Sequence, residues 1–154
     1  MATTVGDLMS RDLTVVMDHS TINEAIDIFY YQNVAGLPVV NLDWRLVGFL
    51  AETDILRAAT PSYLEVLTQS SFLSEEEEEF FNRLEMLGQR LVSEYMVTPP
   101  VSVEPWLSLM SVADLMIRRH FRRLPVVEDG ILVGIIDRKL LWNAVLKGRV
   151  SDDG

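Results

Sequence analysis

The chain has 154 residues, of which 49% are hydrophobic and 23% are charged, and its formal net charge is −10 at pH 7. A chain of this length buries about 70% of its unfolded surface, so it can form a real core and is not disordered throughout. It contains no cysteine, which excludes a disulfide framework, a thiol nucleophile and a zinc–thiolate site. The first residues lack the basic and apolar regions of a signal peptide, and no apolar run reaches the roughly 18 residues of a membrane span. We therefore expect a cytoplasmic protein without membrane partners.

The charge is distributed unevenly along the chain. Residues 1–92 carry 15 acidic and 5 basic residues, whereas residues 93–154 carry 8 of each. Four arginines lie close together at positions 118, 119, 122 and 123. A nucleic acid needs an extended basic surface, which this acidic chain lacks, so we expect no nucleic-acid partner. A small anion needs only a local basic cluster, and the second half is where such a site is expected.

An internal repeat organises the sequence. The segment Leu37–Val40 returns as Leu124–Val127 after 87 residues, and the Val-Gly pair at Gly48 returns at Gly134 after 86. Each copy has the same order of elements: a short β-branched run, a helix, two strands and a helix. The repeat predicts an α/β (α+β) fold of two pseudo-symmetric βαββα units. The predicted division is 1–60 for the first unit, 61–93 for a helical insert and 94–150 for the second unit.

The elements of the first copy follow from periodicity and capping. A short strand is expected over 14–17, followed by a helix that begins at Thr21, which has Glu24 at capping-box spacing. Two strands are expected over 37–41 and 46–50. A closing helix is expected over 52–59.

Residues 61–93 interrupt the repeat. Ser74 and the five glutamates that follow it predict a helix N-terminus, because acidic residues favour the positive end of the helix dipole. A metal-binding role for the glutamates is the alternative. Apolar residues then recur at helical spacing, at Phe80, Leu84, Leu87 and Leu91. The insert is therefore predicted to contain an amphipathic helix.

The second copy repeats the order of the first. A strand is expected over 101–103, then a helix that begins at Ser108 and has little polar face. Two strands over 124–127 and 131–136 are joined by a tight turn at Asp129 and Gly130. A closing helix is expected over 138–146.

These motifs resemble a tandem pair of CBS domains, known as a Bateman module. The resemblance rests on the two ordered copies of Leu-Pro-Val-Val followed by Val-Gly, and it covers everything except the insert and the tails. It implies a pseudo-twofold pair of units with a cleft on each side. It also implies a regulatory sensor of adenine nucleotides or related adenosyl ligands.

The resemblance also assigns a ligand site. Family sites use a Gly-x-x-(Ser/Thr)-x-x-Asp segment, and here that segment begins at Gly48, places Ala51 where a hydroxyl is expected, and ends at Asp54. In the second copy Leu140 replaces the aspartate. A carboxylate can accept hydrogen bonds from two ribose hydroxyls, and arginine suits phosphate. The predicted ligand residues are Ala51, Thr53, Asp54, Thr98, Pro99, Pro100, Val101, Arg122, Arg123 and Leu124.

Simpler roles compete with these assignments. Asp54 could merely cap the closing helix, and Arg122 and Arg123 could lie at a solvated helix end, where bases complement the dipole. The opposite cleft would combine Asp137 and Leu140 with Asp12, Leu13, Ala35 and Gly36. It offers acids where a phosphate would lie, so we expect it to be empty or to take an uncharged or cationic ligand.

The sequence therefore predicts a non-enzymatic regulatory module. It contains no nucleophile–base pair, glycine-rich phosphate loop or metal-ligand spacing. The resemblance implies AMP, ADP, ATP or S-adenosylmethionine as the regulatory ligand, and a regulated protein in trans as a partner. The alternative is a dimerisation or interaction scaffold with degenerate clefts. We also expect a homodimer through the apolar helices at 109–117 and 140–146, unless the insert helix covers them.

Overall fold

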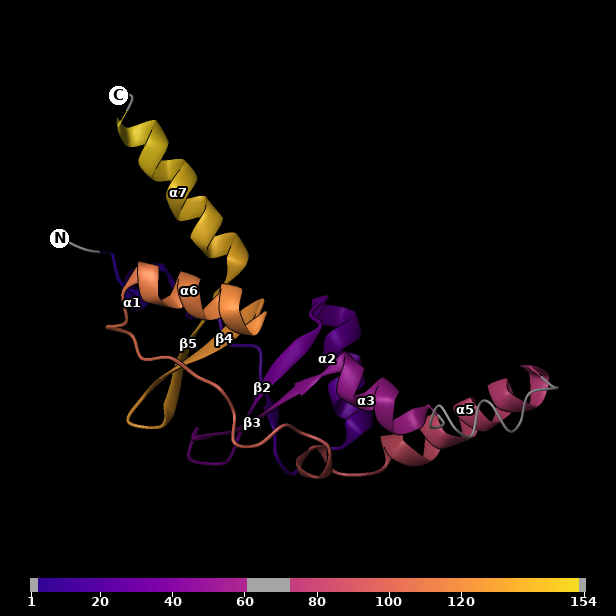
Figure 1. Cartoon of the computed structure of the whole chain (residues 1–154). Coiled ribbons are helices and arrows are strands. Elements are labelled where there is room, and N and C mark those ends of the chain that lie inside the picture. The colour runs from indigo at the N-terminus through magenta and orange to yellow at the C-terminus, as the bar shows by residue number, and fades with distance from the viewer. Residues whose placement is uncertain (1–2, 61–72, 153–154) are drawn as a thin grey trace. The chain divides into compact units, whose positions relative to one another are not determined.

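The computed structural model describes residues 3–60 and 73–152 (Figure 1). Contacts divide the chain into two compact units, each named here after the copy that dominates it. The copy-one unit comprises Thr14–Leu42 and Val47–Pro99. The copy-two unit comprises Met1–Leu13, Asp43–Leu46 and Pro100–Gly154. The segment that precedes each copy in sequence therefore contributes to the unit of the other copy.

The copy-one unit is built on a small sheet whose strand order is β1-β2-β3. Its strands are β1 (Val16–Met17), β2 (Gly36–Val40) and β3 (Leu46–Ala51). β1 pairs in parallel with β2, and Val16 lies opposite Val39. The strand β2 is buried along its whole length, as expected for the centre of a sheet covered on both faces.

The described part of this unit also contains helices and a 3-10 turn: α2 (Ile22–Gln32), α3 (Glu52–Ala59), α5 (Leu73–Gly88) and η1 (Val92–Glu94). The predicted cap of α2 is present, because Thr21 Oγ1 accepts a hydrogen bond from Glu24 N at 3.2 Å. The core joins α2, α3 and the C-terminal part of α5 to the sheet. Its buried residues are Val16, Ile22, Ala25, Phe29, Leu37, Val39, Leu50, Ile55, Ala59, Leu87 and Val92.

The described residues of the copy-two unit form an antiparallel hairpin and three helices: α1 (Val5–Leu8), α6 (Leu109–Arg119), β4 (Arg123–Glu128), β5 (Ile131–Asp137) and α7 (Arg138–Asp152). The hairpin turns at Asp129 and Gly130, which have φ angles of 53° and 82°. Positive φ at both central residues is the geometry of a type I′ turn. The buried core consists of Val5, Val103, Val112, Met116, Leu124, Val126 and Ile136.

The leading segments explain why both copies carry a Val-Gly pair. Val97 and Phe49 exchange two backbone hydrogen bonds of 2.8 and 3.1 Å in the copy-one unit. Ser10 and Ile135 exchange the equivalent pair, at 2.8 and 2.9 Å, in the copy-two unit. A methionine of each leading segment then lies directly against a glycine, Met96 against Gly48 and Met9 against Gly134, where a Cβ would collide with the methionine side chain. Each glycine therefore admits a side chain from the segment that leads into the other copy.

Three predictions of secondary structure need correction. The strand expected over 101–103 is only an isolated parallel bridge between Val103 and Val126. Two prolines at 99 and 100 precede it, and they have no backbone N–H for a longer ladder.

The helix α6 does have a polar stripe, because Ser111, Asp114 and Arg118 are all exposed. Their spacing of three and four residues places them on one face of the helix. The closing helix α7 continues past residue 146 to Asp152.

The insert helix forms where the amphipathic pattern predicts, but it ends at Gly88, so Leu91, the last residue of the predicted pattern, lies beyond the helix and is 43% exposed. Phe80, Leu84 and Leu87 all belong to or pack against the core of the copy-one unit. The apolar face of α5 is therefore used within its own unit, in contact with α2 and α3. Ser74, the expected cap, lies inside α5, which begins at Leu73, and its side chain is outside the described residues.

Candidate functional site

Asp54 lies on the first turn of α3 and caps the N-terminus of that helix. Its Oδ2 accepts a hydrogen bond from the backbone N of Ala51 at 2.9 Å, and its Oδ1 lies 3.6 Å from Nη1 of Arg57. The side chain of Asp54 is 13% exposed, whereas that of Arg57 is 77% exposed. Two carboxylate oxygens offer about four lone-pair positions, so one capping bond leaves capacity for other donors. Capping and ligand contact are thus compatible in the same side chain.

The second copy caps its closing helix from a different position. Asp137 lies just before α7 and its Oδ1 accepts from the backbone N of Leu140 at 2.9 Å. Its counterpart in the first copy, Ala51, has no side-chain oxygen to do the same for α3. Each closing helix therefore has one capping carboxylate, Asp54 for α3 and Asp137 for α7. Only Asp54 stands at the position that the resemblance assigns to ribose binding.

Four of the predicted residues belong to the copy-one unit with Asp54. Ala51 and Thr53 flank the start of α3, and Thr53 is exposed. Thr98 and Pro99 directly follow Val97, which is paired with β3. The strand β3 leads directly into α3, and its Phe49 also pairs with Val97. The start of α3 and the segment that ends at Pro99 are therefore both attached to β3.

The other predicted residues belong to the copy-two unit. Pro100 and Val101 are partly buried, and Val101 packs against the core cluster that contains Leu124. Leu124 itself is only 1% exposed. Its side chain is committed to the core, so a ligand contact by this residue is confined to its backbone.

Arg122 and Arg123 do not lie at the end of a helix. The helix α6 ends at Arg119, and His120 follows in the left-handed conformation with φ 58°. Arg123 is the first residue of β4, and the carbonyl of Arg122 accepts from the backbone N of Arg138 at 3.1 Å. The simpler role, a basic residue at a solvated helix end, therefore applies to Arg118 and Arg119 in the last turn of α6 instead.

A side-chain hydrogen bond also joins the arginine-rich segment between α6 and β4 to the start of α7. Nε of Arg138 donates to the carbonyl of Phe121 at 3.2 Å, and the guanidinium of Arg119 lies 5.8 Å from the centre of the Phe121 ring. On α6, Nε of Arg118 donates to Asp114 at 2.9 Å. Of the two arginines assigned to phosphate, Arg122 is exposed and Arg123 is half-buried.

The residues predicted for the opposite cleft have structural roles of their own. The carboxylate of Asp137 is the cap of α7, and Leu140 packs against the copy-two core. Asp12 is exposed and its backbone N donates to Ser10 Oγ at 3.2 Å. Ala35 and Gly36 belong to the copy-one unit, where the carbonyl of Ala35 accepts from Glu52 N at 3.0 Å.

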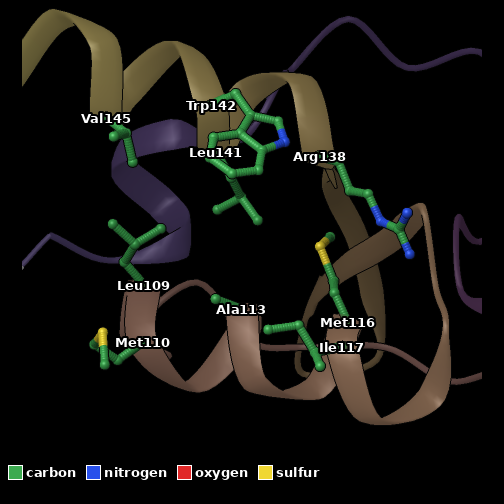
Figure 2. Close-up of a pocket in the computed structure, with 9 residues that line it drawn as sticks. All are labelled: Leu109, Met110, Ala113, Met116, Ile117, Arg138, Leu141, Trp142 and Val145. Carbon is green, nitrogen blue, oxygen red and sulfur yellow. The ribbon is translucent and has the colours of Figure 1, made fainter.

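An apolar groove of 480 Å³ lies between α6 and α7 (Figure 2). Figure 2 shows apolar side chains of α6 and α7 pointing toward one another, with Arg138 at one end. Its lining is Leu109, Met110, Ala113, Met116, Ile117, Arg138, Leu141, Trp142 and Val145. Sequence reasoning singled out both helices as apolar but did not predict this groove. The signal was present in the spacing of Met110, Ala113 and Ile117 along one face of a helix.

The segment that enters the second copy begins with a charged turn. Glu94 Oε1 accepts from Nη2 of Arg90 at 2.6 Å, and its Oε2 accepts from the backbone N of Leu91 at 2.9 Å. The hydrogen bond from Leu91 and the Arg90 side chain hold the pKa of Glu94 below its ordinary value. The same pairing with Glu94 raises the pKa of Arg90.

A metal-binding cluster and a membrane-spanning helix are both absent from residues 3–60 and 73–152. In this part of the chain no three His, Asp or Glu residues are grouped as a metal ion requires. No helix there is long and apolar enough to cross a membrane. The glutamates that begin α5 include positions whose side chains are outside the described residues.

Two copies of one α/β unit, each completed by the segment that precedes the other, define the class of paired α/β modules. The chain belongs to the CBS domain family, which it matches over residues 5–60 and 92–141. The predicted resemblance and the α/β fold of two CBS units are therefore confirmed.

The relatives include stand-alone CBS-pair proteins. The chain is 34% identical over 159 residues to the CBS domain-containing protein CBSX1, chloroplastic, of Arabidopsis thaliana; the match covers 97% of this chain and 67% of that protein. The crystal structure of the CBS-pair protein CBSX2 from Arabidopsis thaliana superposes with a TM-score of 0.78 at 30% identity, covering 97% of this chain and 98% of the other. A crystal structure of CBSX2 in complex with AMP gives a TM-score of 0.73 at 30% identity, with 96% and 98% coverage.

Proposed function

We propose that the chain is a non-enzymatic regulatory module that binds one adenosine-containing ligand of the AMP or ATP type. It would thereby act as a sensor of energy state or of a metabolite. The observation that carries this proposal is the carboxylate of Asp54, which caps α3 with one oxygen and keeps acceptor capacity for a ribose. The similarity to CBSX2, which binds AMP, supports the ligand class.

The proposed contacts follow the sequence assignments. Asp54 accepts from the ribose hydroxyls, with Thr53 and Ala51 beside it. Thr98, Pro99, Pro100 and Val101 bind the base through an apolar slot and their backbone groups. Arg122 and Arg123 bind the phosphate, since guanidinium forks match phosphate oxygens and both residues lie outside α6. The backbone at Leu124 completes the set.

Titration calorimetry tests this proposal directly. AMP, ADP, ATP and S-adenosylmethionine are titrated into the protein, and we expect a stoichiometry near one per chain for at least one of them. The site is single because Leu140 stands where Asp54 stands in the first copy. Mass spectrometry of ligand released by heating the purified protein identifies what it carries from cells. Two equal sites, or no binding of any adenosine compound, would contradict the proposal.

A second candidate function is an interaction scaffold whose clefts bind nothing. The apolar groove between α6 and α7 favours this role, because it is a surface suited to a protein partner. Thermal unfolding with and without nucleotide separates the two functions. A ligand at 100 times its dissociation constant adds about 2.7 kcal/mol to the free energy of unfolding, whereas an empty scaffold shows no change.

We also propose that the protein forms a homodimer through its CBS helices and acts on a regulated protein in trans. Large exposed apolar side chains on α6 and α7 support the dimer: Met110 is 81% exposed, Ile117 73% and Trp142 67%. A cytoplasmic location stays a prediction, and localisation of a tagged full-length protein tests it.

A further inference from the structure

The ion pair between Arg57 and Asp54 on α3 is loose. Nη1 of Arg57 lies 3.6 Å from Oδ1 of Asp54, beyond the roughly 2.7–2.9 Å of a charged hydrogen bond. Three other arginine–carboxylate pairs are hydrogen-bonded: Arg83 with Glu79 at 2.7 Å, Arg90 with Glu94 at 2.6 Å and Arg118 with Asp114 at 2.9 Å. At its longer distance Arg57 donates no hydrogen bond to Asp54, so the contact is electrostatic and another acceptor can replace it.

Asp54 and Arg57 are both absent from the second copy. Their counterparts, 86 residues later, are Leu140 and Asn143. Leu140 packs against the copy-two core, and Asn143 carries no charge. The copy that lacks the proposed ribose carboxylate therefore also lacks the guanidinium beside it.

A single helix sets the spacing between Arg57 and Asp54. The two residues are three positions apart on α3, so both side chains leave the same face of the helix. Arg122 and Arg123, which the sequence assigns to phosphate, belong to the copy-two unit. The copy-one unit thus has a carboxylate suited to ribose and, next to it, a guanidinium suited to phosphate.

The side chain of Arg57 can exchange the carboxylate for a phosphate at little cost. It is 77% exposed, and an exposed ion pair contributes little because water screens it. A terminal phosphate carries a charge of about −1.5 to −2 at pH 7 and offers three acceptor oxygens. The guanidinium fork matches this arrangement of oxygens. A phosphate beside α3 therefore competes successfully with Oδ1 of Asp54 for Arg57.

We propose that Arg57 is the phosphate-selecting residue of the Asp54 site. In the free chain its guanidinium lies beside Oδ1 of Asp54. When an adenosine 5′-phosphate binds, the ribose hydroxyls donate to Oδ1 and Arg57 turns to the phosphate, while Oδ2 keeps the capping bond from Ala51 N. This inference rests on the proposed function and narrows its ligand to adenosine 5′-phosphates.

The group at the 5′ position of the ligand determines the effect of Arg57. AMP carries a negatively charged phosphate there, adenosine a neutral hydroxyl, and S-adenosylmethionine a positively charged sulfonium. A guanidinium attracts the first of these groups and repels the third. Removal of Arg57 is therefore expected to change the affinities for AMP and S-adenosylmethionine in opposite directions.

Titration calorimetry of Arg57→Ala with these three compounds tests the proposal. We expect AMP to bind about 10-fold or more weakly than to the wild type, because a hydrogen bond between charged groups is lost. We expect the affinity for adenosine not to fall, and S-adenosylmethionine to bind up to about 5-fold more tightly, because a screened repulsion is removed. Arg57→Lys should retain part of the AMP affinity, since it keeps the charge without the fork.

Arg118→Ala is the matched control. Arg118 is 76% exposed and pairs with Asp114 of its own helix, so this change also removes an exposed arginine from an ion pair. Arg118 has no part in the proposed site, and we expect its removal to leave the affinity for all three compounds unchanged. Thermal unfolding checks that each variant is folded.

Four results would overturn the role of Arg57 while the proposed function stands. These are an unchanged AMP affinity in Arg57→Ala, equal losses for all three compounds, equal weakening of AMP by Arg118→Ala, and a wild type that prefers S-adenosylmethionine to AMP. A folded wild type that binds none of the three compounds would instead overturn the proposed function and this inference together.

Discussion

Replacing Asp54 by asparagine separates the two roles of this side chain. In Asp54→Asn the side chain keeps one carbonyl oxygen, which can still accept from the backbone N of Ala51, the bond that is 2.9 Å long in the native protein. The change replaces a charge-assisted hydrogen bond by a neutral one, so the stability loss is about 1 kcal/mol, or about 2–4 °C in Tm. The proposed ribose contact loses more. With its oxygen engaged in the cap, the amide presents donors to the hydroxyls, and the loss of about 3 kcal/mol corresponds to roughly 100-fold weaker binding.

Asp137→Asn is the matched control for this change. Asp137 caps α7 with a bond of the same length, 2.9 Å to Leu140 N, but it has no part in the proposed nucleotide site. Both variants are compared by thermal unfolding and by calorimetry with AMP and with adenosine. We expect similar losses of Tm, and a loss of affinity for both ligands only in Asp54→Asn. If Asp54→Asn binds AMP as the wild type does, Asp54 is only a helix cap and the ribose assignment is wrong.

Three further predictions concern the arginines, a glycine and a charged turn. Arg122→Ala and Arg123→Ala should each weaken AMP binding by about 10-fold or more and leave adenosine binding nearly unchanged, because a bond to a charged group contributes roughly 1.5–3 kcal/mol; equal losses for the two ligands would show that the arginines act on folding. Gly48→Ala should lower the free energy of unfolding by about 1–3 kcal/mol in chemical denaturation, because its Cβ would collide with Met96 and overpacking costs that much; a wild-type denaturation midpoint would contradict this packing. Glu94→Gln should lower Tm near neutral pH but not in acid: the pKa of Glu94 is lowered in the folded chain, so its stabilisation is present above the pKa of an unfolded glutamate and is lost as the pH falls through the folded value. A Tm difference that persists in strong acid would refute the role of this carboxylate.

The sequence was sufficient for elements whose signals are local. The helix α3 forms over Glu52–Ala59 as predicted, and α2 and α6 begin at Thr21 and Ser108, whose hydroxyls accept from Glu24 and Ser111. Caps and 3.6-residue periodicity involve neighbours within four positions, so a single sequence contains them. The hairpin turn is predictable for the same reason, since Asp-Gly at its centre tolerates positive φ.

Contacts between distant segments could not be predicted in this way. The pairing of Val97 with Phe49 and of Ser10 with Ile135 assigns each leading segment to the unit of the other copy. Nothing in the local pattern around Val97 or Ser10 specifies these partners, because a single paired residue shows no alternation. The strand predicted over 101–103 failed for a related reason: β-branched residues favour a strand, but only Val103 has a partner on both hydrogen-bonding sides.

The candidate site shows the same limit. Sequence reasoning left open whether Asp54 caps a helix or contacts a ligand, and the structure shows the capping bond to Ala51 together with unused acceptor capacity. The placement of Arg122 and Arg123 beyond the end of α6 depended on where that helix stops, and helix ends are less sharply defined by sequence than helix interiors. The groove depended on how α6 and α7 pack beside one another, a question of tertiary packing alone.

Restoring the missing hydroxyl at position 51 offers a test that gains function rather than losing it. Ala51 has the extended N-cap geometry, with φ −106° and ψ 155°, but no oxygen to accept from the first turn of α3. In Ala51→Thr, the hydroxyl can accept from the backbone N of Asp54, while Asp54 continues to accept from N of residue 51. This reciprocal pair is a capping box, and a threonine cap contributes about 1 kcal/mol relative to alanine, or about 2–4 °C in Tm.

Ala51→Val is the isosteric control, because it has the shape of threonine without its oxygen. We expect Ala51→Thr to unfold at a higher temperature than both the wild type and Ala51→Val. We also expect it to bind AMP more tightly, since the resemblance places a ligand-contacting hydroxyl at this position. A rise in Tm without a rise in affinity would show that the hydroxyl serves only the helix. Equal Tm values for the threonine and valine variants would show that the α3 N-terminus already has its donors satisfied, so Asp54 alone is a sufficient cap.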